Sequence, residues 1–295
     1  MYDCKILADS LNVETNDRLT TMLMTFPNIV HQEMVRHRAF SFSVGSNRAI
    51  PVQRLIKKVH DDPFIPERFP ENGKGMTPKG YYEKGSEKES GAYDVWTETM
   101  HEALIQAAKL EEIGVHKSIA NRLLGPFQWV TMVVTGDYRA WRNFFLLRSH
   151  PDAQYEMQRI SDMALALYME NEEDKVKPGG WHIPFLSESI RGMGNDLHLK
   201  LSVARCARTS YLTHDGVYDL ADDERLHDQL LTHEPPHAGP FEHQALALPV
   251  SFKSANYQGW RSYRNFLEEA GKMIGHDYPN EETLDARLAE LGKTR

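Results

Sequence analysis

The sequence contains very little cysteine. Only Cys4 and Cys206 occur among its 295 residues, too few and too widely separated for a disulfide framework or the paired spacing of a zinc site. So small a thiol content is typical of a reducing compartment, and we expect a cytoplasmic protein. Neither cysteine stands where a catalytic nucleophile is expected, because one lies near the N-terminus and the other in the middle of a predicted helix.

Long apolar runs and a basic excess are missing as well. No stretch approaches the roughly 20 residues that cross a bilayer, and the first five residues lack the basic-then-apolar pattern of a signal peptide, so we expect no membrane partner. Lys and Arg number 34 against 42 Asp and Glu, a net charge of -8. This balance argues against a nucleic-acid polymer as partner but is compatible with a local basic pocket for a nucleotide.

What is present is an ordinary globular composition, 41% hydrophobic and 26% charged. Hydrophobic periodicity predicts strands over residues 18–30, 127–135 and 244–252, with Pro27 ending or bulging the first. It predicts helices over residues 93–113, 116–124, 138–147, 153–169, 196–211, 222–232 and 255–271. The Pro-, Gly-, Lys- and Glu-rich stretch 62–92 is typical of a long surface loop.

Two segments share a weak pattern. Residues 20–38 and 245–264 each pass from an apolar strand, through a glutamine, into an arginine-rich helix start. Two copies of one strand–helix unit would produce this pattern, but so would any strand followed by an amphipathic helix. We therefore expect residues 1–295 to form one intimately joined catalytic unit, with two echoed halves, 1–175 and 196–295, as the alternative.

The most informative stretch is Arg36-His37-Arg38, followed after seven residues by Ser46 and then by Arg48. Three cationic or cationisable side chains stand together here, near small and hydroxylated residues. The arginine guanidinium is a planar fork that matches phosphate oxygens and the edges of flat heterocycles. A glycine and serines let a phosphate approach backbone N–H groups closely. The pattern indicates a site for a phosphorylated, planar ligand.

Two further clusters carry arginine. Arg122 lies four residues before Pro126. Downstream, Arg139, Asn143 and Arg148 occur in a predicted helix at separations of four and five residues, which we expect to place them roughly on one stripe. Aromatic and aliphatic neighbours indicate that this stripe is the wall of a pocket. Late in the chain, the turn His237-Ala238-Gly239-Pro240-Phe241-Glu242-His243 is, taken alone, compatible with a metal site or a plain loop.

These motifs together resemble the flavin-dependent thymidylate synthases. Residues 36–46 are similar to that family's RHR-X7-S signature, and residues 137–156 to its N-x-R-x-x-x-N-F-x-x-L-R...H-A-Q-W-E element. Residues 207–211 resemble its A-R-V-S-Y stretch, and residues 237–243 its H-x-S/T-P-F-E-H turn. In typical members these last two elements precede RHR, whereas here they come after it, as a rearranged or circularly permuted relative would show.

Several positions depart from the family pattern. Ser43 replaces an Asn of the family, Val44 a Glu or Gln, and Ala49 a Tyr. Glu33 replaces a Gln. Val44 cannot hydrogen-bond to a substrate edge, so we expect base recognition to differ from ordinary dUMP binding. Asp137, Asp152 and Gly239 replace an Asn, a His and a hydroxyl residue of the family.

The resemblance implies an α+β fold, with a mixed or antiparallel sheet and packed helices, and reductive C5 methylation of dUMP. It implies FAD as cofactor, NADPH and methylenetetrahydrofolate as co-substrates, and a homotetramer or homodimer, because the family builds its active sites between subunits. The pyrimidine deoxynucleotide monophosphate would be held by Arg36, Ser46, Arg48, Arg122 and Arg148, with Arg148 the catalytic residue that polarises the uracil. FAD would be held by His37, Arg38, Arg139, Asn143 and His237.

Other functions are compatible with the sequence. The same chemistry allows C5 hydroxymethylation, or methylation of dCMP, and the departures allow an inactive scaffold that binds flavin or nucleotide. A classical thymidylate synthase is disfavoured because neither cysteine suits a thiolate nucleophile. A metal phosphohydrolase would use His-Asp pairs, which occur at His60-Asp61, His214-Asp215, His227-Asp228 and His276-Asp277. These pairs lack a supporting His and Asp at consistent spacing, so we expect no metal.

Overall fold

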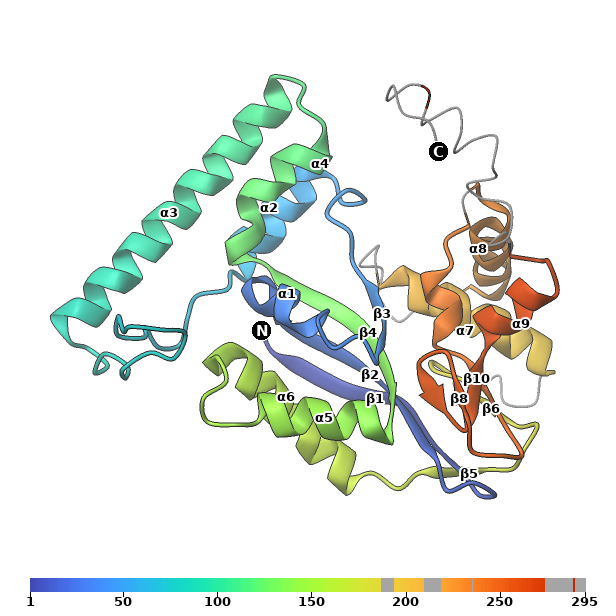
Figure 1. Cartoon of the computed structure of the whole chain (residues 1–295). Coiled ribbons are helices and arrows are strands. Elements are labelled where there is room, and N and C mark those ends of the chain that lie inside the picture. Colours follow the sequence, from blue (N-terminus) through green and yellow to red (C-terminus); the bar gives the residue numbers. More distant parts are fainter. Residues whose placement is uncertain (187–193, 210–218, 235, 274–288, 290–295) are drawn as a thin grey trace.

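A five-stranded sheet forms the centre of the molecule (Figure 1). The computed structural model describes residues 1–186, 194–209, 219–234, 236–273 and 289. The strands are β1 (Asp3–Asn12), β2 (Arg18–Pro27), β3 (Ser41–Val44), β4 (Trp129–Asp137) and β5 (Asp174–Val176), in the order β3-β4-β2-β1-β5. Neighbours are antiparallel except β1 and β5, which are parallel. The predicted strand at 18–30 is confirmed, with Pro27 as its last residue, whereas β1 was not predicted.

Helices cover one face of this sheet. α5 (Tyr138–Arg148) and α6 (Tyr155–Glu170) pack beneath it in Figure 1. The even-numbered residues Met22 and Met132 point to this face and join Trp141 and Phe144 in the largest buried cluster. Alternation of side chains along a strand sends the odd-numbered residues to the other face. Burying each large apolar side chain contributes about 1.5–3 kcal/mol, so this layer is a major source of stability.

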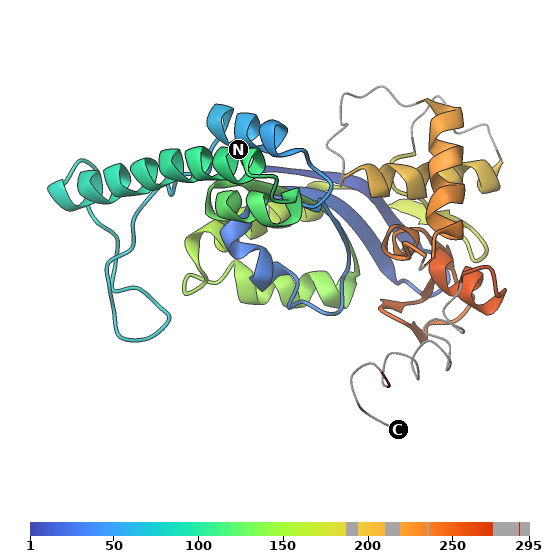
Figure 2. The same cartoon turned by 90° about the horizontal axis from the view of Figure 1, so that it is seen from above.

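A second helical layer extends beyond the sheet (Figure 2). It contains α2 (Val52–Asp61), the long α3 (Glu87–Glu112), α4 (Lys117–Ala120) and a 3-10 helix, Asn121–Phe127. The predicted loop over 62–92 ends earlier than expected, because Ser86 accepts a hydrogen bond from the backbone N–H of Glu89 and so caps α3. The predicted helix over 116–124 is α-helical only in α4. Pro126 lies inside the tighter 3-10 turns that come next.

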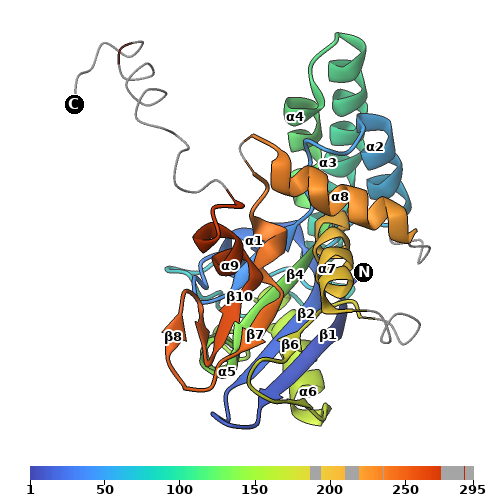
Figure 3. The same ribbon diagram turned by 90° about the vertical axis from the view of Figure 1, so that its right-hand side faces the viewer.

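The C-terminal part of the chain packs against the other face and one end of the sheet (Figure 3). It comprises α7 (Asn195–Arg208), α8 (Leu220–Thr232), a small sheet in the order β10-β7-β6, the β8–β9 hairpin and α9 (Tyr263–Glu269). The short strands are β6 (Trp181–His182), β7 (Ala245–Ala247), β8 (Lys253–Ser254), β9 (Tyr257–Gln258) and β10 (Trp260–Ser262). Cys206 of α7 lies against Leu23 and Val133 of the central sheet.

The predictions for residues 244–271 are partly wrong. The strand expected over 244–252 is only β7, and the helix expected over 255–271 begins at Tyr263. Gly259 has φ +73°, a left-handed conformation that interrupts a helix, and a Cβ there would lie 2.1 Å from the Asp17 carboxylate. Ser262 then caps α9 by accepting from the N–H of Asn265. Packing of this turn against Asp17 therefore overrides the helical periodicity.

The two segments with the shared pattern differ in the element that comes after the strand. β2 leads into a 3-10 turn, Asn28–Val30, and the four-residue α1 (His31–Met34), whereas β7 leads into the β8–β9 hairpin before α9. The two-halves hypothesis stays a prediction. Hydrogen bonds join the N- and C-terminal parts, since Asn12 Nδ2 donates to the carbonyl oxygens of Leu248 and Gly259. The α+β prediction with a mixed sheet is confirmed.

Candidate functional site

The RHR stretch and the end of α5 meet in the structure. Arg148, the last residue of α5, donates from Nε to His37 Nε2 at 2.9 Å and from Nη1 to the Glu33 carboxylate at 2.7 Å. The RHR turn closes tightly onto β4, because a Cβ at Gly136 would lie 2.4 Å from the Phe40 ring. Glycine at 136 therefore allows the contact that brings residues far apart in sequence to one place.

His37 is not a cation in this arrangement. Burial, with the nearby Arg148 guanidinium as a second cause, lowers the pKa of His37 to about 4. At neutral pH the imidazole is therefore neutral and accepts the hydrogen bond from Arg148. Of the three cationic or cationisable groups expected here, the two arginines carry charge, and the neutral His37 accepts the hydrogen bond that orients Arg148.

These residues form a hollow of about 310 Å³, which we call the RHR hollow. It is lined by Arg36, His37, Arg38, Ala39, Phe40, Ala140, Asn143, Leu147 and Arg148. Arg36, Arg38 and Asn143 are exposed, and their side chains make no hydrogen bond or ion pair with any described residue. Two unpaired guanidiniums beside an apolar wall can bind an anionic ligand that also carries a flat ring.

Arg139 does not share this hollow. It lines a separate hollow of about 390 Å³ together with Asp17, Asp137 and Glu173. The expected single stripe of Arg139, Asn143 and Arg148 is wrong, because nine residues at 3.6 per turn carry Arg148 about half a turn away from Arg139. Asn143 and Arg148 do line the same hollow.

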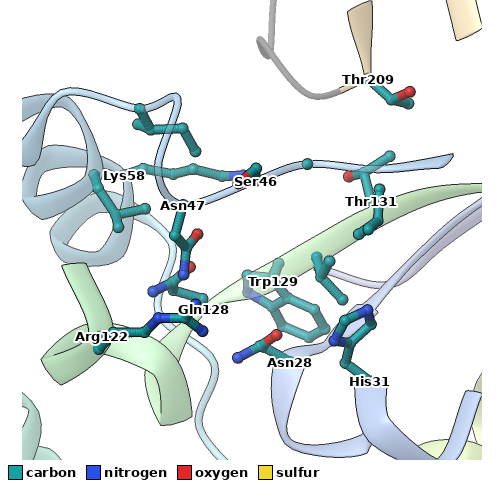
Figure 4. A pocket seen from close by; sticks show the side chains of 15 residues that line it. Asn28, His31, Ser46, Asn47, Lys58, Arg122, Gln128, Trp129, Thr131 and Thr209 are labelled. Atoms are coloured by element: carbon teal, nitrogen blue, oxygen red, sulfur yellow. The ribbon is translucent and has the colours of Figure 1, made fainter. Parts of the chain in front are cut away.

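A second hollow, which we call the Ser46 hollow, contains two other candidates. Ser46 and Arg122 line it, and its volume is about 220 Å³ (Figure 4). The loop after β3 is fixed there by the buried Asn121, whose Nδ2 donates to the carbonyls of Asn47 at 2.8 Å and Ile50 at 2.9 Å. The residues between 116 and 126 therefore hold the loop that carries Ser46.

Arg48 lies at the edge of this loop. It is exposed and is not among the residues that line the Ser46 hollow. Its backbone N–H donates to Ser46 Oγ at 3.3 Å. The five residues expected to hold the nucleotide are therefore divided, with Arg36 and Arg148 in the RHR hollow and Ser46 and Arg122 in the Ser46 hollow.

Two basic residues of the Ser46 hollow were not predicted from the sequence. Lys58 of α2 and His31 of α1 both line it, and in Figure 4 the Lys58 side chain extends toward Ser46. Burial lowers the pKa of Lys58, with Asp62 opposing and Arg54 adding to the shift, and burial lowers the pKa of His31. None of the motifs includes Lys58, so no sequence signal placed it here.

The rearranged motifs reach the same region. The 3-10 helix Gly239–Glu242 packs along β3, and a Cβ at Gly239 would lie 3.8 Å from the Phe42 carbonyl oxygen. Thr209, from the A-R-T-S-Y stretch, lines the Ser46 hollow, whereas Ser210 and Tyr211 lie outside the described residues. The fold therefore brings motifs from both ends of the chain to β3 without help from a second subunit.

His237 is exposed, and its ring meets His233 edge-on with the centroids 4.5 Å apart. Its predicted contact with the same FAD as Arg38 stays a prediction.

Asp137 has a structural task. Its Oδ1 accepts from the backbone N–H of Ala140 at 2.9 Å and caps α5, and its Oδ2 accepts from the N–H of Gln258 at 3.0 Å. A carboxylate at the start of a helix is favoured by the helix dipole. The aspartate at this position therefore anchors both α5 and the C-terminal hairpin. Of the other departures, Val44 lines the Ser46 hollow and Asp152 lines a different hollow.

Both thiols are held in the unreactive form. Burial raises the pKa of Cys4 to about 12, and burial raises the pKa of Cys206 still further from its ordinary value. A thiol is a nucleophile only as the thiolate. That neither cysteine starts the chemistry stays a prediction, which the raised pKa values support.

Metal ligands do not gather within the described ranges, where no group of three or more His, Cys, Asp or Glu side chains could hold an ion. The rings of His60 and His227 each bond to the aspartate that comes next in the chain, Asp61 and Asp228. The pairs at 214–215 and 276–277 lie outside the described residues. In the part of the chain that the structure covers, none of the helices has the length and apolarity needed to cross a bilayer.

Comparisons with known proteins agree with the motifs. The family model named "Thymidylate synthase complementing protein" matches residues 18–171. The flavin-dependent thymidylate synthase of Mycolicibacterium vanbaalenii is 29% identical over 133 residues, which cover 44% of this chain and 48% of that protein. The enzyme of the same name from Kosmotoga olearia is 27% identical over 135 residues, covering 46% and 56%. The chain thus spans about half the length of the curated relatives it matches.

Solved structures of the UMP/dUMP methylase PolB from Streptomyces cacaoi are also similar. The form bound with 5-Br UMP has a TM-score of 0.49 and 16% identity, covering 58% of this chain and 89% of that one. The form bound with 5-Br dUMP has a TM-score of 0.41 and 18% identity, covering 52% and 66%. Because the family model spans β2 to α6, just over half of the chain, this protein belongs to the thymidylate synthase complementing protein family.

Proposed function

We propose that this chain catalyses reductive C5 methylation of dUMP, with methylenetetrahydrofolate as carbon donor, FAD as cofactor and NADPH as reductant. The observation that carries the proposal is the meeting of Arg36-His37-Arg38 with Asn143 and Arg148 in the RHR hollow. Relatives named flavin-dependent thymidylate synthases support the reaction class. A nucleotide and a flavin are both anionic and planar, and the hollow offers unpaired guanidiniums beside apolar side chains.

The residues present suit a flavin dinucleotide. Arg38 and Asn143 are exposed donors with no partner among the described residues, and Leu147 offers an apolar surface. The volume of about 310 Å³ lies at the lower end of the range of about 300–1,000 Å³ for small-molecule pockets, so the hollow takes only part of the molecule. When bound and reduced, a flavin supplies the hydride and relays the carbon unit. Arg38, Asn143 and the neutral His37 would hold it.

Arg148 is proposed to polarise the pyrimidine. Glu33 and His37 occupy its Nη1 and Nε atoms, so the guanidinium is held in one orientation. Its Nη2 makes no hydrogen bond within the described residues and is the atom left to donate to a pyrimidine oxygen. Preorganised hydrogen-bond donors that point to where negative charge develops in the transition state usually make the largest single contribution to catalysis of this kind. Glu33 lowers the net charge of the cluster, while His37 adds none.

The phosphate is proposed to bind in the Ser46 hollow. Ser46, Lys58 and Arg122 supply a hydroxyl donor and two cations to one small cavity. Arg48 and Arg36 would join from the rims of the two hollows. Because the candidate nucleotide residues lie in two hollows, a site shared between subunits would unite them, and this supports the expected homotetramer or homodimer. Light scattering on the purified protein tests that expectation, and a monomer that turns over would contradict it.

The first test is flavin content. The purified chain should carry, or take up, FAD with a yellow absorbance, and Arg38→Ala should weaken this uptake. Arg142→Ala is a matched control, because Arg142 is exposed on the same helix as Asn143 but does not line the RHR hollow. A protein that neither contains nor takes up flavin would contradict the proposal.

The second test is the reaction itself. Incubation with labelled methylenetetrahydrofolate, FAD, NADPH and either dUMP or dCMP should yield a labelled methylated product from dUMP, identified by its mass. Product from dCMP alone, or a hydroxymethylated product, would support the alternative reactions. Val44, which replaces a family Glu or Gln, lines the Ser46 hollow and is the departure most relevant to them. Tight nucleotide binding without any product would indicate an inactive scaffold.

A further inference from the structure

A continuous chain of hydrogen bonds crosses the sheet on the face opposite α5 and α6. We call it the histidine chain. Its links are His182 Nδ1 to Ser10 Oγ (2.9 Å), His182 Nε2 to Thr21 Oγ1 (2.8 Å), Thr21 to Thr135 (2.7 Å), Thr135 Oγ1 to His243 Nδ1 (2.8 Å) and His243 Nε2 to Ser43 Oγ (2.9 Å). All six side chains are buried, and both histidines are 0% exposed. Such a fully satisfied polar chain in a dry interior permits few arrangements.

The histidine chain couples the tautomer of His182 to that of His243. Both imidazoles are neutral, because burial lowers the pKa of His182 and of His243 to about 3. Each neutral ring has one N–H and one acceptor nitrogen. If Ser10 donates to His182, the donation runs in one direction through both threonines, and His243 donates to Ser43. If Ser43 donates to His243, every link reverses. The hydrogen bond between His243 and Ser43 is present in both cases.

Ser43 belongs to β3, a short edge strand of the central sheet. β3 has four residues and lies at the sheet edge, so its backbone pairs with β4 alone. β3 ends at Val44, and the polypeptide continues directly into Gly45 and Ser46; all three residues line the Ser46 hollow. A short edge strand has few hydrogen bonds of its own, so an added bond from outside the sheet has a large effect on its position. His243 supplies that bond from a segment 200 residues further along the chain.

We propose that His243 is a positioning residue for the nucleotide pocket: through its Nε2 bond to Ser43 it holds β3, and with it the loop that presents Ser46 to the nucleotide. This inference rests on the proposed function, because it assumes that the Ser46 hollow binds the nucleotide phosphate. His243 does not touch the ligand in this role. It acts only through the strand that carries the binding residue.

The test uses two substitutions that separate the two nitrogens of the ring. In His243→Asn the amide reaches the Nδ1 position and keeps the bond to Thr135, but it loses Ser43. In His243→Gln the amide reaches the Nε2 position and keeps the bond to Ser43. Titration calorimetry with dUMP on the purified full chain measures affinity, and thermal denaturation measures stability. Ser43→Ala, which removes a single hydroxyl, provides a third variant that retains the fold if either histidine variant does not.

We expect His243→Asn and Ser43→Ala to weaken dUMP binding about tenfold, as loss of one buried hydrogen bond allows. His243→Gln should stay within about threefold of the wild type, although it too loses a buried link and thermal stability. Adding Ser43→Ala to His243→Asn should cause no further loss. Equal affinities for the two histidine variants, or wild-type affinity for Ser43→Ala, would overturn the inference. A wild-type chain that binds no dUMP would instead refute the proposed function.

Discussion

The RHR hollow contains one histidine with a lowered pKa and the histidine chain contains two, yet the two regions are built differently. In the RHR hollow, His37 lies beside Arg148 and Glu33, so charges balance one another at a surface open to a ligand. In the histidine chain, the rings of His182 and His243 form hydrogen bonds to hydroxyl groups and are not exposed to solvent. The RHR hollow keeps charged side chains available for binding. The histidine chain instead consists of neutral side chains, which lets the two parts of the protein pack together. Burial therefore leaves charged groups at the surface in one region and surrounds neutral groups in the other.

The sharpest way to test this contrast is Arg148→Ala. If Arg148 stabilises charge on the pyrimidine, the substitution should cost about 2–4 kcal/mol of transition-state stabilisation while the fold survives. Arg148→Lys should not rescue turnover fully, because a compact ammonium cannot reproduce the planar fork that orients separate donors toward His37, Glu33 and the ligand. Steady-state turnover measures the effect, with Arg142→Ala as control. Wild-type turnover in Arg148→Ala would remove Arg148 from the site.

The histidine chain should reveal itself in the pH dependence of stability. The folded-state pKa values of His182 and His243 lie near 3, below the unfolded value of about 6.5. The unfolded chain then binds more protons, so stability is fully present above about pH 6.5 and falls as the pH drops toward 3. Each histidine contributes a slope of at most about 1.4 kcal/mol per pH unit.

Urea denaturation at pH 7, 6 and 5 measures this slope. His182 is the titratable group whose charge also lowers the pKa of His243, and the hydrogen-bond partners of His243 are the hydroxyls of Thr135 and Ser43. His243→Asn should therefore be less stable at pH 7 but should lose stability less steeply on acidification than the wild type. An unchanged slope in this variant would show that His243 does not titrate with the predicted shift.

Substitutions of Glu33 test how much turnover depends on the negative charge that pairs with Arg148. The Arg148–Glu33 pair is partly exposed, with side chains 21% and 28% accessible, and pairs of this kind are worth about 0–1 kcal/mol. Glu33→Gln keeps a carbonyl oxygen that accepts from Arg148 and restores the family's residue, so kcat/KM should stay within about fivefold. Glu33→Ala should lower it further, because Arg148 loses a partner that orients it. A Gln variant as impaired as the Ala variant would show that the negative charge itself is required.

The smallest effect is expected from the cysteines. A Cys4→Ser/Cys206→Ala variant should keep its turnover, since both thiols have raised pKa values and neither lines the two hollows. Cys206 is fully buried against Leu23 and Val133, so a modest loss of thermal stability is expected from its truncation. Loss of turnover in a variant that still melts cooperatively would indicate a thiol mechanism.

Local pattern was sufficient for much of the fold. The apolar pattern of residues 18–30 and 138–147 predicted β2 and α5, because both elements bury regularly spaced apolar side chains in the core on the α5–α6 side of the sheet. It failed where distant contacts decide the backbone. β1, in which polar residues interrupt the apolar ones, forms because β2 and β5 pair with it on its two sides. The 255–262 turns form because Gly259 packs on Asp17.

Predictions about the candidate site divide in the same way, into those that local sequence could make and those that needed the fold. The sequence by itself determined the chemistry, since Arg36, Arg38, Arg122 and Arg148 are cations whatever the fold, and their spacing indicated the family. Only the tertiary structure decided that His37 is neutral, that Arg139 lies apart from Arg148, and that Lys58 joins Ser46. The physical reason is that ionisation and hydrogen bonding depend on burial and on partners up to 200 residues away, as for His243 and Ser43. No local pattern carries that information.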